Sequence, residues 1–172
     1  MKVYLATDHA GFSLKEKVKV FLESKGYDII DCGAPTFDKD DDYPDFISKA
    51  AAGVSYNPEE AKGIIFGGSG QAEAIVANKF PHVRCALFYA AVVPVGAADV
   101  TGRKSDNPLE MIRLTREHND ANMLSLGARF LTDEETLKVV ELWLTTSFSK
   151  HERHIRRIEK IEKIEEDLAA TK

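Results

Sequence analysis

Short apolar runs alternate with longer amphipathic segments along this chain of 172 residues. The runs have the length of buried strands, and the segments between them carry apolar residues at helical spacing. Strands are predicted at residues 3–6, 28–32, 63–66, 84–89 and 123–126. Helices are predicted at residues 13–25, 44–54, 71–78, 109–118 and 133–145. This order indicates an α/β fold in which helices cover both faces of a five-stranded parallel sheet.

A further helix is predicted at the end of the chain, over residues 149–172. Ser149 followed by Glu152 is the capping-box pattern of a helix start. Successive apolar residues step back by about 60° around this helix, so its apolar stripe winds around it. The stripe consists of Ile155, Ile158, Ile161, Ile164 and Leu168. We expect this helix to pack on a second copy of the chain in a homodimer, and packing on its own domain is the alternative.

The length of the chain allows one well-formed core and is too short for two ordinary domains. We therefore expect residues 1–172 to form a single domain. Residues 92–108 contain two prolines and two glycines with little periodicity, which predicts an irregular loop. A loop of this length inside a compact domain is usually a lid, a contact element or disordered.

The composition is that of a globular protein, with 44% hydrophobic and 30% charged residues. No apolar stretch approaches the roughly 20 residues that span a bilayer, and no signal-peptide cleavage site follows the first apolar run. The two cysteines, Cys32 and Cys85, fall in predicted strands and are expected to be small buried thiols without a disulfide. These features predict a cytoplasmic protein that does not bind membranes.

The net charge of −5 argues against general nucleic-acid binding. The charges are unevenly placed along the chain. Acidic residues cluster in an early loop, at Asp38, Asp40, Asp41, Asp42 and Asp45. Basic residues cluster near the C-terminus, at Lys150, Arg153, Arg156, Arg157, Lys160 and Lys163. A local basic patch on an acidic protein is compatible with a small phosphorylated ligand.

A glycine-rich turn, FGGSGQAEA at residues 66–74, directly follows the third predicted strand. A strand that ends in such a turn before a helix points several backbone N–H groups at one spot, which suits an oxyanion or a phosphate. Ser69 and Glu73 lie within one helical turn of this spot. The carboxylate is a candidate base for proton transfer. The alternative is that Glu73 only complements the dipole of the helix.

Other polar residues follow the carboxyl ends of predicted strands. Asp8 and His9 come after the first strand, and Arg129 comes after the fifth. Ligands of parallel α/β sheets bind beyond these strand ends. We therefore expect these residues and the glycine turn to share one edge of the sheet.

A second set of candidates lies just before the fifth strand and on the last helix. His118 can exchange a proton near neutral pH, and Asn119 beside it can orient a substrate. Arg153 and Arg157 are four residues apart on one helix face, where guanidinium groups suit phosphate oxygens and where His154 and Arg129 can join them. The alternatives are a histidine that interacts with a helix dipole and a solvated Arg/Glu-rich face.

Several other kinds of site lack the required spacing. The glycine turn has neither the Gly-Lys-Ser/Thr ending of a nucleotide P-loop nor the third glycine of a dinucleotide fingerprint. His151 and His154 are three apart without an evident third ligand, so no metal is expected. Cys85 is a weak candidate nucleophile because no base is adjacent to it in the sequence.

Taken in order, these residues resemble the type B ribose-5-phosphate isomerases, a family that includes allose- and galactose-6-phosphate isomerases. The resemblance spans almost the whole chain. Its elements are Asp8-His9-Ala10-Gly11, Asp42-Tyr43-Pro44, Gly68-Ser69-Gly70, Ala77-Asn78-Lys79, Arg84-Cys85-Ala86, Glu117-His118-Asn119-Asp120, Gly127-Ala128-Arg129 and Arg153-His154-Ile155-Arg156-Arg157. The family implies a Rossmann-like α/β/α sandwich and a dimer, or a pair of dimers, with each site at a subunit interface.

The resemblance also implies a role for each matched residue. Glu73 would be the base that takes the proton from C2 and returns it at C1; in the other branch of the family a cysteine does this from the position of Gly67. His118 would open the sugar ring, and Ser69 would act beside these two residues. The phosphate would be bound by His9, Arg129, Arg153, His154 and Arg157. The sugar would be held by Asp8, Tyr43, Ser69 and Asn119, and the enediolate by the amides of Gly68, Ser69, Gly70, Gln71 and Ala72.

The implied chemistry is an aldose–ketose isomerisation of ribose 5-phosphate and ribulose 5-phosphate in carbohydrate metabolism. Abstraction of a proton next to a carbonyl needs a base, oxyanion donors and exclusion of water, and no cofactor or metal. Burial would raise the pKa of Glu73 and the helix N-terminus would lower it, so the sequence leaves its value open.

Two departures from the family pattern bear on the substrate. Residues 92–108 exceed the usual strand-to-helix connection, which affects substrate size or subunit packing. Ala72 replaces a common glycine, which affects the freedom of the turn. The alternatives are a hexose 6-phosphate isomerase and a non-catalytic module that binds sugar phosphates.

Overall fold

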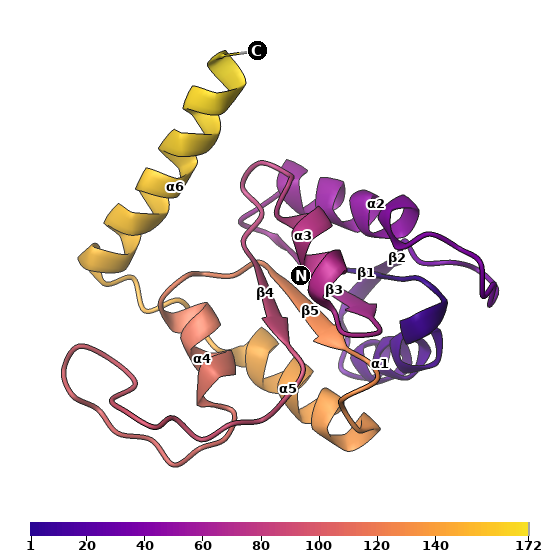
Figure 1. Cartoon of the computed structure of the whole chain (residues 1–172), viewed down its shortest axis with the longest axis horizontal. Coiled ribbons are helices and arrows are strands. Elements are labelled where there is room, and N and C mark those ends of the chain that lie inside the picture. Colours follow the sequence, from indigo (N-terminus) through magenta and orange to yellow (C-terminus); the bar gives the residue numbers. More distant parts are fainter. Residues whose placement is uncertain (172) are drawn as a thin grey trace.

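The computed structural model describes residues 1–171. A five-stranded parallel sheet with the order β2-β1-β3-β5-β4 forms its centre (Figure 1). The strands are β1 (Lys2–Thr7), β2 (Asp28–Asp31), β3 (Ala61–Gly67), β4 (Cys85–Phe88) and β5 (Met123–Gly127). The predicted parallel sheet is confirmed, and every predicted strand end lies within two residues of the observed one.

Helices cover both faces of the sheet, as predicted. They are η1 (His9–Gly11), α1 (Phe12–Ser24), α2 (Tyr43–Tyr56), α3 (Gln71–Ala77), α4 (Glu110–Glu117), α5 (Asp133–Thr145) and α6 (Glu152–Ala170). One apolar cluster joins α1, α4 and α5 to the sheet, and a second joins α2 and α3 to its other face. The result is a three-layer α/β/α sandwich.

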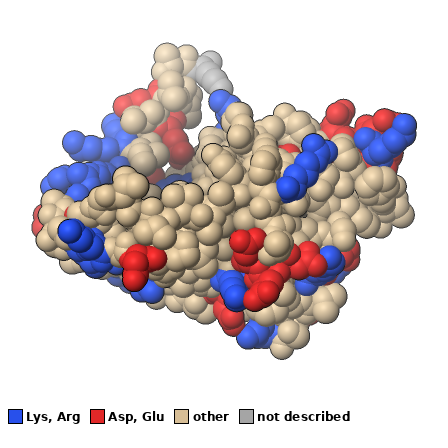
Figure 2. All heavy atoms as spheres, turned by 60° about the horizontal axis from the view of Figure 1, so that its bottom comes forward, with Lys and Arg blue, Asp and Glu red and all other residues tan. Residues whose placement is uncertain are grey.

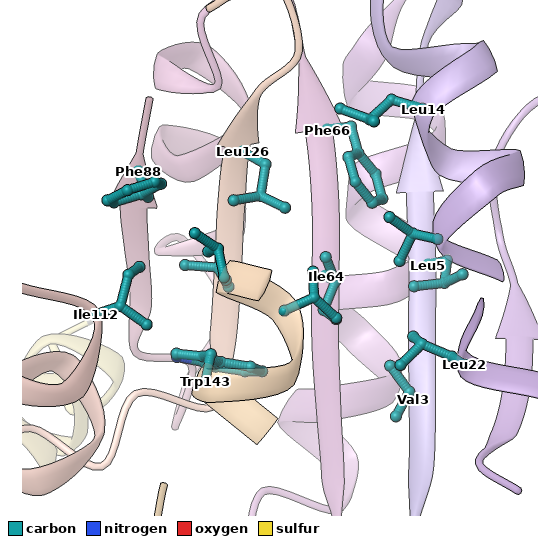
Figure 3. Packing of buried hydrophobic residues seen from close by; sticks show 14 residues of the cluster. Val3, Leu5, Leu14, Leu22, Ile64, Phe66, Phe88, Ile112, Leu126 and Trp143 are labelled. Carbon is teal, nitrogen blue, oxygen red and sulfur yellow. The ribbon is translucent and has the colours of Figure 1, made fainter. Parts of the chain in front are cut away.

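The first cluster is drawn in Figure 3, where Trp143 from α5 lies beside Ile64 of β3 and Ile112 of α4. Every residue of β3 is buried, as expected for a central parallel strand. Burial of each large apolar side chain contributes about 1.5–3 kcal/mol. The core thereby fixes the strand ends from which the polar residues project.

The last helix begins later than predicted. Lys150 has a left-handed backbone with φ of 54°, and the Ser149 N–H donates to the Glu117 carbonyl at 3.1 Å. The backbone therefore becomes helical only at Glu152, and His151 occupies the N-cap without a side-chain hydrogen bond. The prediction of a capping box between Ser149 and Glu152 is wrong, because the turn at Lys150 delays the start of the helix.

The helix α6 stands away from the α/β body (Figure 1). Its outer apolar residues are exposed, by 47% at Ile161, 59% at Ile164 and 64% at Leu168. The helix also touches its own domain, since the His82 N–H donates to Glu165 at 2.8 Å and Arg84 lies 3.8 Å from Glu162. Packing on its own domain, the alternative considered for the 149–172 helix, therefore accounts for part of α6 only. Packing on a partner stays a prediction, and residue 172 lies outside the described residues.

The predicted irregular loop at residues 92–108 is confirmed, since it contains neither helix nor strand. Its ends are held together where the Val92 N–H donates to the Pro108 carbonyl at 2.9 Å. Arg103 anchors the loop to α4 through ion pairs to Glu110 at 2.6 Å and Glu117 at 3.6 Å. The loop therefore lies along α4, which leads into His118.

Within residues 1–171, none of the helices combines the length and the apolar character that crossing a membrane requires.

Candidate active site

One group of predicted site residues gathers at the carboxyl edge of the sheet, and we call it the carboxyl-end group. Asp8 and His9 follow β1, and Arg129 follows β5. The glycine turn and Glu73 follow β3, with Gly68 so close to Arg129 that a Cβ there would lie 3.2 Å from the guanidinium carbon. The predicted meeting of these residues at one edge is confirmed.

The glycine turn presents its backbone to this edge. Gly70 caps α3 with φ of 76°, a left-handed conformation that favours glycine. Among residues 1–171, we find no acceptor for the amides of Gly68 and Ser69, which are therefore available to a ligand. Ala72 lies inside α3 and has no positive φ. The expected effect of Ala72 therefore concerns the second residue of α3, and it stays a prediction.

Glu73 is buried, with 4% of its surface exposed, and its carboxylate packs against the α-carbon of Gly67. Any side chain at position 67 would overlap the carboxyl group of Glu73. A glycine at 67 and this placement of Glu73 therefore require each other. A cysteine at 67 would expel the carboxylate from the place it now fills.

The environment raises the pKa of Glu73 above its ordinary value. Burial is the main cause, and the charge of Asp8 adds to it, whereas the backbone N–H of Glu73 itself acts in the opposite direction. Burial thus outweighs the stabilisation at the start of α3. A carboxylate with a raised pKa is a better proton acceptor, which suits a general base.

His9 is held by an acidic residue that sequence reasoning left among the charges of an early loop. Asp41 Oδ1 lies 2.7 Å from His9 Nδ1 and accepts the His9 backbone N–H at 2.9 Å. The hydrogen bond to Asp41 raises the pKa of His9, and the charge of Asp8 supports this shift. A carboxylate far along the chain gives no sequence signal for this pairing.

Asp8, His9 and Asp41 also offer ligand atoms within 4.8 Å of one another, a spacing that a metal ion can bridge. The short His9–Asp41 contact, however, is a hydrogen bond that uses the nitrogen and one oxygen that a metal would need. The contact between His9 and Asp41 is therefore described as an ion pair.

A second group lies at the amino edge of the sheet, and we call it the amino-end group. It consists of His118, Asn119, Arg153, His154 and Arg157. These residues line a cavity of about 420 Å³ together with the start of β4. Figure 2 shows basic side chains gathered near the start of α6, on the side of this cavity. The cavity combines donors, a titratable ring and two guanidinium groups.

The ring of His154 packs against the ring of His118. The two rings stack with centroids 4.3 Å apart and planes 13° apart. His154 is 6% exposed, and burial lowers its pKa, with His118 and Arg153 acting in the same direction. A neutral His154 thus fixes the orientation of the His118 ring.

Two arginines hold the turn that carries His118 and Asn119. Arg84 donates to the carbonyls of Asn119 at 3.1 Å and Asp120 at 3.2 Å. Arg116 pairs with the Asp120 carboxylate at 2.7 Å, and Asp120 itself has a left-handed φ of 43°. These supports were not singled out from the sequence, although Arg84 and Asp120 fall in two of the matched motifs.

Cys85 is also on the wall of this cavity. Burial raises the pKa of its thiol to about 12. A thiol with this pKa stays protonated at neutral pH, and Cys85 therefore cannot serve as a nucleophile.

The two groups lie at opposite ends of the sheet within one chain. His118 precedes the start of β5, whereas Arg129 follows its end, and the five residues of β5 extend about 16 Å. A five-carbon sugar phosphate is shorter than this separation. Tyr43 begins α2 against the second apolar cluster, two residues after Asp41, whose carboxylate contacts His9.

The fold and its two polar groups define a Rossmann-like α/β protein with a buried carboxylate at one edge of the sheet and a histidine-lined cavity at the other. A model of the Ribose/Galactose Isomerase family matches residues 3–96 and 107–161. The chain belongs to the ribose/galactose isomerase family.

Named relatives resemble most of the chain. Ribose-5-phosphate isomerase B of Mycolicibacterium paratuberculosis is 41% identical over 153 residues, which cover 89% of this chain and 84% of the relative. The enzyme of the same name from Mycobacterium tuberculosis is 39% identical over 89% of this chain and 83% of the relative. The crystal structure of ribose-5-phosphate isomerase B from Mycoplasma genitalium with bound ribulose-5-phosphate has a TM-score of 0.83 at 33% identity, covering 96% of each chain.

Proposed function

We propose that this chain is an aldose–ketose isomerase that interconverts ribose 5-phosphate and ribulose 5-phosphate. The observation that carries the proposal is the buried carboxylate of Glu73 beneath a turn with available amides. The names of its relatives support the same activity.

In the proposed mechanism, Glu73 takes the proton from C2 of the open-chain aldose. The electron pair forms the C1–C2 double bond of an enediolate, whose negative oxygen is stabilised by the amides of the 68–72 turn. Glu73 returns the proton to C1 while the hydroxyl proton on O2 passes to O1, which leaves the C2 carbonyl of the ketose. His118 moves the proton that ring opening requires, and His154 keeps its ring in place.

The complete site is proposed to form between two copies of the chain. The carboxyl-end group supplies Glu73 and the anion-binding turn, and the amino-end group supplies His118 and two arginines. One substrate cannot touch both groups of one chain, because the length of β5 separates them. A homodimer, or a dimer of dimers, brings the groups of different chains together, and the exposed apolar residues of α6 provide a surface for this contact.

The substrate is a small phosphorylated sugar, and neither a nucleic acid nor a membrane is a proposed partner. A cytoplasmic location also stays a prediction. The experiment that tests the function is a substrate-panel assay of the purified chain on ribose, allose and galactose phosphates. Proton exchange at C2 in deuterated water tests catalysis separately, since a module that only binds sugar phosphates gives binding without exchange.

Arg157→Ala is expected to raise KM for the phosphorylated sugar about tenfold or more, with a smaller effect on kcat. Arg157 lines the cavity of the amino-end group, and a charge-assisted hydrogen bond to phosphate contributes about 1.5–3 kcal/mol. Steady-state kinetics check this result. Arg156→Ala is the matched control, since Arg156 is exposed and does not line the cavity. Equal KM values for both variants and the wild type would assign Arg157 to a solvated helix face.

The loop tip at residues 99–102 is expected to limit substrate size. Residues 97–106 lie outside the ranges that match the family model, and Asp99 and Thr101 line a second cavity of about 510 Å³ with His118 and Arg153. Since the Ala98 N–H donates to the Arg103 carbonyl at 2.7 Å, a Gly-Gly turn can replace the tip. We expect the ratio of kcat/KM for hexose over pentose phosphates to rise about tenfold.

A loop variant that keeps the tip serves as the control for this measurement. Val95 lies in the same loop, is fully exposed and does not line the cavity, so that Val95→Ala should keep the wild-type ratio. An unchanged ratio after tip replacement would show that the loop does not select the substrate.

A further inference from the structure

We propose that Asp41 is a positioning residue that orients His9 and favours its cationic form for the phosphate group of the substrate. The inference rests on the proposed function for the identity of the ligand. It concerns a residue outside the matched motifs whose carboxylate contacts His9 of the carboxyl-end group.

The geometry fixes His9 at two points. One oxygen of Asp41 accepts the backbone N–H of His9 at 2.9 Å and lies 2.7 Å from its Nδ1. The two residues are 32 positions apart, so this contact ties the segment after β1 to the loop before α2. With Nδ1 engaged, Nε2 is the ring nitrogen that remains for a ligand.

The second oxygen of Asp41 indicates that the negative charge itself matters. The Asp41 side chain is 7% exposed, and its Oδ2 is buried without a hydrogen-bond partner among residues 1–171. A buried carboxylate with an unpaired oxygen costs more free energy than an amide of the same shape, whose unpaired group would carry no charge. A purely structural tether would therefore need only an acceptor at this place.

The charges that face His9 favour its protonated form. Asp41 is in direct contact and Asp8 lies 3.9 Å from Nδ1, whereas the charge of Arg129 acts against them. The pKa of His9 is raised, chiefly by the hydrogen bond to Asp41. An imidazolium donates a stronger, charge-assisted hydrogen bond to phosphate than a neutral ring does. It also joins Arg129 in neutralising the two charges of a phosphate monoester.

Asp41→Asn separates the charge from the hydrogen bond, because the amide oxygen can still accept from both His9 groups. We expect the pKa of His9, followed by NMR titration without substrate, to fall by about one unit or more. The KM for ribose 5-phosphate should stay near the wild-type value at pH 6 and rise about tenfold by pH 8, while kcat changes by less than about twofold. Asp40→Asn is the matched control, since Asp40 is exposed in the same loop without contact to His9.

The NMR titration decides the proposal even if the chain isomerises no sugar phosphate. A His9 pKa that is the same in Asp41→Asn and wild type would overturn it, as would a KM that keeps its wild-type pH dependence in this variant. If Asp41→Asn does not fold, the wild-type His9 pKa decides, and a value at or below that of a free histidine contradicts the proposal.

Discussion

Replacing Glu73 by glutamine is expected to lower kcat by about 100-fold or more, with binding of the sugar phosphate retained. Removal of a positioned catalytic base has this scale of effect. Glutamine has the shape of glutamate and therefore still fits against Gly67, where the carboxylate leaves no room for another side chain. Steady-state kinetics give kcat, and calorimetric titration with ribulose 5-phosphate gives the affinity.

The pH dependence of the wild type provides an independent test of the same base. Glu73 acts in its deprotonated form, and burial raises its pKa. Activity should therefore fall as the pH decreases through this raised pKa, which lies on the alkaline side of the pKa of an exposed glutamate. The acid limb of the profile should be absent from the residual activity of Glu73→Gln.

Stability gives the control that separates catalysis from folding. A glutamate whose pKa is higher in the folded than in the unfolded state destabilises the fold at a pH above both values. Glu73→Gln should consequently melt at or above the wild-type temperature at pH 7. Glu60→Gln, at an exposed carboxylate of the turn before β3, should leave kcat unchanged. Near-normal turnover in Glu73→Gln would show that another group removes the proton.

The sheet was predictable because its strands depend on local features. The apolar run at 63–66 is buried on both faces, and the parallel order requires a helix between consecutive strands. The glycine turn was predictable for the same reason, since a left-handed backbone position such as Gly70 favours glycine in the sequence. These elements need no knowledge of distant contacts.

The features that were missed depend on contacts between segments far apart in the chain. Asp41 stands among other aspartates, and only the folded chain brings it to His9, 32 positions away. The late start of α6 follows from the Ser149 hydrogen bond to Glu117 and the left-handed Lys150. Both are tertiary effects that override a local capping pattern.

The separation of the site residues into two distant groups also could not be predicted from the sequence. Sequence reasoning assigned Glu73 and His118 to one reaction, and the register of β5 places them at opposite edges of the sheet. The resemblance implied an interfacial site. The geometry supports that proposal, because each chain carries both halves in positions where it cannot use them together.

Mixing two inactive variants is therefore expected to restore activity. Glu73→Gln inactivates the carboxyl-end group of its chain, and His118→Asn inactivates the amino-end group. In a heterodimer of these variants, one site combines two intact groups and the other site combines two inactivated groups. Random assortment makes half of the dimers mixed, so about one quarter of all sites should be active. Co-expression with two different tags and purification on both isolates the mixed dimers, in which about one half of the sites should be active, and the assay compares them with parents that are each nearly inactive.

A pair of variants in the same group supplies the control for the mixing experiment. Glu73→Gln and Arg129→Ala both alter the carboxyl-end group, so every site of their heterodimer keeps one altered residue. This pair should show no gain. Restoration in the control, or activity of the first pair that only equals the mean of its parents, would contradict a site shared between subunits. Restoration confined to the first pair requires that Glu73 and His118 of different chains meet at one substrate.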